Sequence, residues 1–123
     1  MNLSGEAVRF WMQDQKIARE HVLVVTDDLA LPFGTLRIRP AGGAAGHNGI
    51  TSIIECLGTD QFARLRFGIG NDYPKGRQVD YVLGKWGKEE AAALPERISV
   101  AEDMVKSFAA IGLQMTMNAF NNK

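Results

Sequence analysis

The order of hydrophobic and polar positions predicts alternating helices and strands. Apolar residues at helical spacing predict helices over residues 3–17 and 50–57. Residues 21–26 are mostly apolar without alternation, which favours a strand buried on both faces of a parallel or mixed sheet. Residues 35–39 and 64–70 alternate apolar and basic positions, a pattern typical of half-exposed strands with outward arginines.

The C-terminal part of the chain is predicted to be helical. The apolar residues of one expected helix face are Leu94, Ile98, Ala101, Val105 and Phe108. Gly112 is expected to end this helix, and a short helix follows over 113–120. In the first helix, Trp11 is expected to belong to the core. Strands alternating with helices indicate an α/β fold, with a mixed, mostly parallel sheet and flanking helices in a single domain, residues 1–123.

Composition limits the class of protein. The chain has 123 residues, no formal net charge, 46% hydrophobic and 23% charged residues, as an ordinary globular domain does. No apolar run approaches the roughly 20 residues that span a bilayer, so we expect no membrane association. The N-terminus shows no signal-peptide pattern, and the single cysteine, Cys56, fits a cytoplasmic location.

The charges are unevenly distributed along the chain. The segment from Gly34 to Arg77 contains six basic and three acidic residues. The basic ones are Arg37, Arg39, Arg64, Arg66, Lys75 and Arg77. A basic segment of this kind could present one face to phosphate groups. Charge alone equally favours arginines that are simply solvated along strand edges.

Residues 41–50 concentrate the candidate binding chemistry, because they combine four glycines with His47 and Asn48. A glycine-rich turn that opens a helix leaves free backbone N–H groups, and anions bind such groups. For the glycines alone, a tight surface loop is the simpler interpretation. His47 and Asn48 add strong hydrogen-bonding side chains, so the whole segment favours a binding site.

Asp27 is the candidate catalytic or ligand-orienting carboxylate. It follows the apolar run of residues 21–26 directly, and functional residues of open α/β sheets lie at the carboxyl ends of strands. The pair Asp27 and Asp28 fits a helix cap or a turn equally well. We expect no metal, because two scattered histidines and one cysteine show no ligand spacing.

Five motifs resemble those of bacterial peptidyl-tRNA hydrolases in order and spacing, and together they cover essentially the whole chain. They are Met1–Gly5, Val25–Gly34, Gly42–Gly49, Arg64–Gly70, and Lys75–Gly76 with Asp80–Leu83. The resemblance implies a cytoplasmic enzyme that hydrolyses the ester between peptide and tRNA and so recycles tRNA. It implies no cofactor and no metal. The expected partner is peptidyl-tRNA, with neither DNA nor a membrane, and the expected state is a monomer.

The resemblance also assigns roles to individual residues. It implies a histidine general base that activates water, and Asp27 as the aspartate that orients and stabilises this histidine. Asn2 and Asn48 match asparagines that bind the substrate near the ester and the tRNA end. His47 is expected to make a hydrogen bond to the substrate or within the loop. The basic residues around the site correspond to Arg37, Arg39 and Arg66.

One departure from the family changes the expected activity. The family carries a strand, a Gly-Leu-Gly-Asn-like loop and the catalytic histidine before the motif that here begins at Met1. We therefore expect an N-terminally truncated, impaired hydrolase. His21 lies six residues before Asp27, roughly 20 Å along an extended strand, and is no obvious substitute. Two alternatives stay open: an inactive remnant that binds tRNA or phosphate, and an unrelated small-molecule hydrolase that uses His47 with Asp27.

Overall fold

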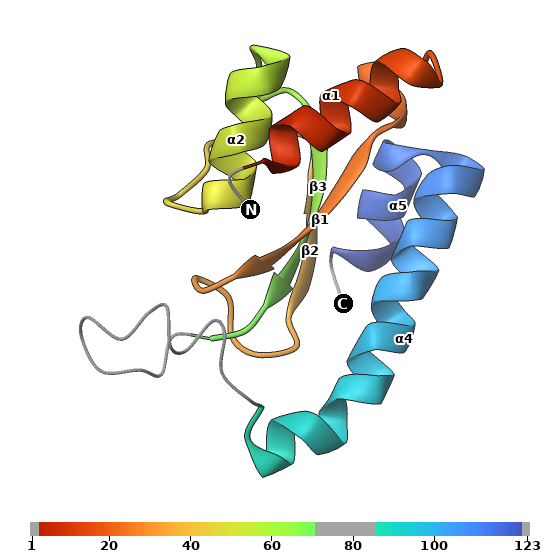
Figure 1. The fold of residues 1–123 in the computed structure, drawn as a ribbon. Helices are drawn as coiled ribbons and strands as arrows, with labels where there is room; N and C mark the ends of the chain where they lie inside the picture. Colours follow the sequence, from red (N-terminus) through yellow and green to blue (C-terminus); the bar gives the residue numbers. More distant parts are fainter. Residues whose placement is uncertain (1–2, 71–85, 122–123) are drawn as a thin grey trace. The chain divides into compact units, whose positions relative to one another are not determined.

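The computed structural model describes residues 3–70 and 86–121 (Figure 1). In chain order its elements are α1 (Ser4–Asp14), a 3-10 turn η1 (Arg19–His21), β1 (Leu23–Asp28), β2 (Leu36–Arg39), α2 (Asn48–Leu57), β3 (Ala63–Gly68), α4 (Lys88–Ile111) and α5 (Leu113–Phe120). Two compact units divide the chain: Met1–Val24 with Arg39–Arg64, and Val25–Ile38 with Leu65–Lys123.

The elements predicted from periodicity are confirmed in type and position. Each predicted helix and strand within the described residues has its counterpart, displaced by only a few residues at the ends. Gly112 is the C-cap of α4, and its backbone N–H donates to the carbonyl of Phe108 at 3.1 Å. The motif segments at 75–76 and 80–83 lie outside the described residues.

The three strands of the described residues form one sheet in the order β1-β3-β2. The N–H of Ile69 donates to the carbonyl of Asp28 at 3.0 Å, so β1 and β3 end side by side and are parallel. The N–H of Gly34 donates to the carbonyl of Gly68 at 2.9 Å, and that of Gly68 to Thr35 at 2.8 Å. The start of β2 thus lies beside the end of β3, which makes this pair antiparallel and the sheet mixed, as predicted.

The position of β1 in the sheet differs from the expectation of a strand covered on both faces. Within the described residues β1 is an edge strand, and the side chain of Val25 is 57% exposed. The central strand is β3, where Leu65 is fully buried. A continuous apolar run indicates a strand, but strand order depends on long-range pairing that the run does not encode.

In the first unit α1 and α2 lie side by side (Figure 1). The N–H of Gly5 donates to Ser52 Oγ at 2.9 Å, and a Cβ on Gly5 would lie 2.1 Å from the Ser52 carbonyl oxygen. The helices therefore approach closely because residue 5 has no side chain. The core cluster of this unit consists of Ile50, Ile53 and Phe62. Trp11 is 57% exposed and packs edge-on against Phe10, so its predicted place in the core is wrong.

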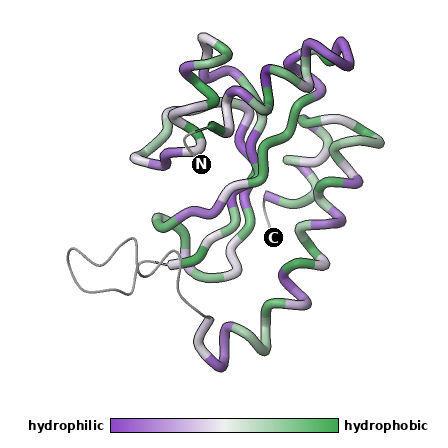
Figure 2. Tube along the Cα trace, in the orientation of Figure 1, coloured by the Kyte–Doolittle hydropathy of each residue, from purple (hydrophilic) through white to green (hydrophobic). Residues whose placement is uncertain are grey.

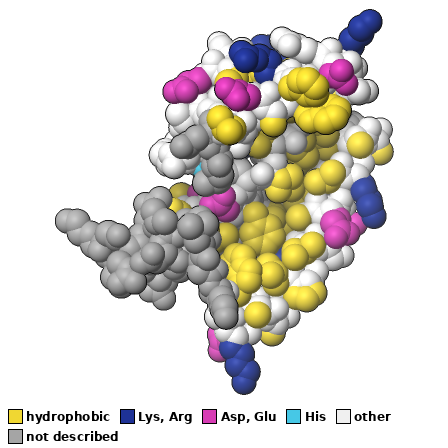
Figure 3. Space-filling view, in the orientation of Figure 1, with side chains coloured by type: hydrophobic (Ala, Val, Ile, Leu, Met, Phe, Trp, Pro, Cys, Tyr) yellow, Lys and Arg dark blue, Asp and Glu magenta, His cyan; other side chains and the backbone are white. Residues whose placement is uncertain are grey.

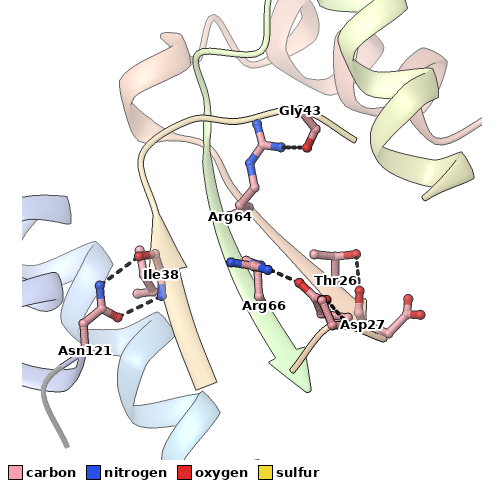
Figure 4. Close-up of polar contacts among 9 residues, drawn as sticks. Thr26, Asp27, Ile38, Gly43, Arg64, Arg66 and Asn121 are labelled. Atoms are coloured by element: carbon pink, nitrogen blue, oxygen red, sulfur yellow. Dashed lines mark hydrogen bonds and ion pairs between the residues drawn. The ribbon is translucent and has the colours of Figure 1, made fainter. Parts of the chain in front are cut away.

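The second unit contains most of the sheet together with α4 and α5. Arg97 of α4 donates from Nη1 to the carbonyl of Gly34 at 3.1 Å. After α5, the side-chain amide of Asn121 pairs with both backbone groups of Ile38, each at 2.9 Å (Figure 4). This amide therefore bonds the edge of β2 as a neighbouring strand would.

α4 combines polar and apolar positions along its whole length. Hydrophilic and hydrophobic stretches alternate on its trace (Figure 2), and hydrophobic side chains gather along it on the face drawn in Figure 3. Met104 is buried, whereas Ile98, Val105 and Ile111 are exposed. Within the described residues, no helix has both the length and the apolar composition needed to cross a membrane.

Candidate functional site

The glycine-rich segment forms a turn that leads directly into α2. His47 is the N-cap residue, and its Nδ1 accepts a hydrogen bond from the N–H of Ile50 at 3.2 Å. The chain turns into the helix through left-handed conformations, with φ of +49° at Ala45 and +81° at Gly46. Asn48 is the first residue of α2, and its side chain is exposed. The predicted turn and helix are confirmed, and the imidazole satisfies one of the helix's first N–H groups.

The side chain of Arg64, on β3, is hydrogen-bonded to this turn. The residue is only 4% exposed, and its Nη1 donates to the carbonyl of Gly43 at 3.3 Å (Figure 4). Its Nη2 donates to the carbonyl of Asp60 at 2.8 Å, and the guanidinium carbon lies 4.2 Å from the centroid of the Phe62 ring. The prediction that Arg64 turns outward is wrong, because main-chain carbonyls supply acceptors that let the guanidinium be buried.

Asp27 lies at the carboxyl end of β1, where α/β proteins commonly carry functional residues. The residue is partly buried, and its backbone carbonyl accepts a hydrogen bond from Thr26 Oγ1 at 3.1 Å. The next residue, Asp28, binds Arg66 of β3 through Oδ2 and Nε at 2.5 Å. Its Oδ1 accepts the N–H of Ala30 at 2.7 Å. The two consecutive aspartates therefore have different surroundings, and Asp28 is an ion-pair partner.

The other two expected arginines lie on β2. Arg37 is partly buried and donates from Nη1 to the carbonyl of Leu36 at 3.0 Å, whereas Arg39 is exposed. Leu36 and Ile38, which alternate with them, are buried. Since alternate residues of a strand face the same side, the two arginines share the polar face of β2, as predicted.

The expected site residues are divided between the two units. The first unit contains Arg39, His47 and Asn48, and the second contains Asp27, Arg37 and Arg66. Asn2 lies outside the described residues. Two residues with direct contacts at the site were not predicted, namely Arg64 and Asp28. Both belong to motif segments, Arg64–Gly70 and Val25–Gly34, but alternation alone assigns Arg64 to solvent and the aspartate pair indicates only a cap or a turn.

Each unit contains side chains of a kind that ester hydrolysis on an RNA substrate uses. A carboxylate such as Asp27 can fix the tautomer of an imidazole and stabilise its protonated form. The exposed amide of Asn48 can donate to a carbonyl oxygen without adding charge, and an exposed arginine such as Arg39 can bind a phosphate. Among residues 3–70 and 86–121, no group of three or more His, Cys, Asp or Glu side chains could hold a metal ion.

Comparison with known proteins identifies the class to which this α/β fold and its polar strand ends belong. The family profile described as peptidyl-tRNA hydrolase matches residues 1–123. Proteins named peptidyl-tRNA hydrolase from Parabacteroides distasonis and Porphyromonas gingivalis are 56% identical over 123 residues and 57% identical over 121 residues. A crystal structure of peptidyl-tRNA hydrolase from Acinetobacter baumannii superposes with a TM-score of 0.88 at 34% identity. The chain belongs to the peptidyl-tRNA hydrolase family.

The extent of these matches differs between this chain and its relatives. The match with the Parabacteroides protein includes all 123 residues of this chain but only 66% of that protein. The match with the Porphyromonas protein includes 98% of this chain and 65% of that protein. The superposition with the Acinetobacter structure includes 98% of this chain and 61% of that chain. The chain thus spans slightly less than two thirds of these relatives.

Proposed function

We propose that this chain acts as a peptidyl-tRNA hydrolase, which hydrolyses the ester between a peptide and tRNA and so recycles tRNA in the cytoplasm. The observation that carries the proposal is the family match over residues 1–123. The proposed partner is peptidyl-tRNA, and the proposed enzyme is a monomer that needs neither a metal nor another cofactor.

Asp27 has the central role in the proposed reaction. Water attacks the ester carbonyl after a histidine of near-neutral pKa removes its proton. The Asp27 carboxylate holds this imidazole in the basic tautomer and stabilises the imidazolium that forms. The location of Asp27 at the end of β1 supports this role, because residues there are fixed by the sheet while their side chains stay accessible at its edge.

Asparagines and arginines bind the substrate in this proposal. Asn2 and Asn48 hold the ester and the tRNA end, since an amide can donate to the carbonyl oxygen and accept from a hydroxyl. The phosphate contacts come from Arg37, Arg39 and Arg66. Contacts of this kind fix the position of RNA without reading its sequence, which suits an enzyme that acts on many tRNAs.

The cap at His47 counts against the alternative of a small-molecule hydrolase. A general base needs an available lone pair, and the Nδ1 lone pair of His47 accepts the N–H of Ile50. Loss of this contact would also remove a helix N-cap, which is worth about 1 kcal/mol. We therefore assign His47 to the structure of the turn, because a neutral imidazole that accepts at Nδ1 carries its proton on Nε2 and can only donate there.

The experiment joins this chain to the part of the Parabacteroides relative that it does not match, and measures cleavage of peptidyl-tRNA. In this fusion Asp27→Asn should lower kcat by roughly three to four orders of magnitude, because the general base loses its orienting carboxylate. The dissociation constant for tRNA should change less than about twofold, since the substitution touches no phosphate contact. Asp103→Asn, an exposed aspartate of α4, is the matched control and should leave turnover unchanged.

Each outcome of this assay separates the proposed functions. Near-normal turnover by the Asp27→Asn fusion would refute the role of Asp27. A fusion that binds tRNA in a salt-sensitive manner without cleaving its ester would support the binding remnant instead. Turnover by the 123-residue chain alone should be impaired relative to the fusion, because the family resemblance leaves the general-base position unmatched.

A further inference from the structure

Asp60 and Arg64 together hold the first residues of the glycine-rich turn. The carbonyl of Asp60 accepts both Arg64 Nη2 at 2.8 Å and the backbone N–H of Gly42 at 3.3 Å. Arg64 Nη1 reaches the carbonyl of the following residue, Gly43, at 3.3 Å. Two consecutive residues of the turn are therefore tied to the segment that leads into β3, and all these groups belong to the same compact unit.

From Gly43 a short path of contacts leads to the residues that are expected to meet the substrate. Ala44 packs against the core cluster of the first unit, and its carbonyl accepts the N–H of His47 at 2.9 Å. His47 then caps α2 through the N–H of Ile50, and Asn48 is the next residue. Gly43 is thus connected to Asn48 through a short series of contacts within the turn.

The chemistry of arginine suits a side chain that binds several backbone carbonyls at once. The guanidinium is a planar fork with five donors, so one side chain can serve several carbonyls in a fixed geometry. The guanidinium carbon lies over the Phe62 ring, and the backbone carbonyl of Phe62 accepts from Nε at 3.4 Å, which limits reorientation. A lysine ammonium lacks the fork, and a methionine fills similar space without any donor. Methionine therefore removes the donors from the carbonyls of Gly43 and Asp60, and lysine lacks the fork that serves both at once.

We propose that Arg64 is a positioning residue of the peptidyl-tRNA site. By holding Gly43 it sets the place of His47 and Asn48, and through Asn48 it sets the affinity for the 3′ end of peptidyl-tRNA. Arg64 itself is only 4% exposed, so we assign it a role through the turn and no contact with the substrate. The RNA part of this inference rests on the proposed function, whereas the placement of the turn does not.

The first experiment measures the turn itself by NMR on the 123-residue chain. Arg64→Met should shift and broaden the backbone amide signals of residues 43–49, and Arg64→Lys should produce a smaller change. Arg97→Met is the matched control, since Arg97 also donates to a glycine carbonyl but in the second unit. This control should move signals near Gly34 and leave those of residues 43–49 unchanged.

The second experiment measures binding of an RNA minihelix that ends in CCA and carries an amide-linked, non-hydrolysable peptide. Arg64→Met should raise the dissociation constant roughly fivefold or more, the effect of an oriented hydrogen bond lost. In an Asn48→Ala background the same substitution should change it less than about twofold, because the group that Arg64 positions is already absent. Equal effects in both backgrounds would overturn the inference and leave Arg64 with a general structural role.

The two experiments also separate failure of this inference from failure of the proposed function. If the unsubstituted chain and the fusion both fail to bind the minihelix, the proposed function fails, and the NMR result alone decides the role of Arg64 in the turn. Unchanged signals for residues 43–49 in folded Arg64→Met protein overturn that role. If Arg64→Met does not fold, the comparison is made with Arg64→Lys, whose signals should still differ from those of the unsubstituted chain.

Discussion

At the scale of single residues, the ion pair between Asp28 and Arg66 connects two neighbouring strands beside Asp27. Each oxygen of the Asp28 carboxylate has its own donor, one from Arg66 and one from the N–H of Ala30. The Arg66 and Asp28 side chains are only 24% and 16% exposed. Solvent therefore screens this pair less than a surface pair, and the Asp28 carboxylate fixes the orientation of the Arg66 guanidinium.

A double-mutant cycle with Asp28→Ala and Arg66→Ala tests this contact. Urea unfolding should give a coupling free energy of about 1 kcal/mol or more, because the pair is partly buried and hydrogen-bonded. The pair of Glu96 and Arg97 is the control, since Glu96 is 72% exposed and its coupling should stay below about 0.5 kcal/mol. Similar couplings for the two pairs would mean that burial adds nothing to the contact at Asp28.

At the scale of elements, the approach of α1 to α2 depends on Gly5. Its N–H donates to Ser52 Oγ, and the helices leave no volume for a Cβ at this position. The packing of these helices brings Val8 of α1 against the core cluster of the first unit. One glycine thus permits both the interhelical hydrogen bond and the apolar contact.

Gly5→Ala should lower the free energy of unfolding by roughly 1–3 kcal/mol, because the methyl group forces the helices apart. Chemical denaturation followed by circular dichroism measures the change. Gly43→Ala is the control, since a Cβ at Gly43 would meet nothing within 4 Å. A Gly5→Ala protein as stable as this control would show that α1 shifts at little cost.

The elements were largely predictable from the sequence, whereas several contacts were not. Hydrophobic periodicity is a local property, and it correctly located helices such as α2 and ended α4 at Gly112. The edge position of β1 depends on pairing between distant segments. One of the carbonyls that accept from the buried Arg64 lies 21 positions away, at Gly43. The assignment of the site residues stays a prediction, and the structure adds contacts such as those of His47 and Arg66.

At the scale of the whole molecule, charge is concentrated although the total is zero. The chain carries 14 basic and 14 acidic residues, and the segment from Gly34 to Arg77 has twice as many basic as acidic ones. Arg37 and Arg39 lie within this segment on the polar face of β2. An RNA substrate would release counterions when it binds such a surface, so its affinity would depend on salt.

Arg37→Ala combined with Arg39→Ala should weaken binding to different tRNA species alike. The slope of log K against log salt concentration should fall by roughly 1–2, because about two phosphate contacts are lost. Arg9→Ala with Lys16→Ala removes the same charge from exposed positions outside the basic segment and should change the slope by less than about 0.5. If the β2 double variant keeps the full slope, its arginines do not contact phosphates.

The amide of Asn121 on β2 has a consequence for the nascent chain. Ile38 and Asn121 are 83 positions apart, so the ribosome must add 83 residues before this edge of the sheet can close. At about 5–20 residues per second this takes roughly 4–17 s. Until Asn121 has been made, its amide cannot pair with the N–H and carbonyl of Ile38, and an unpaired strand edge can pair with another chain once it has left the ribosome. The β2 edge is thus most vulnerable to mispairing during translation, before α5 and Asn121 have been made.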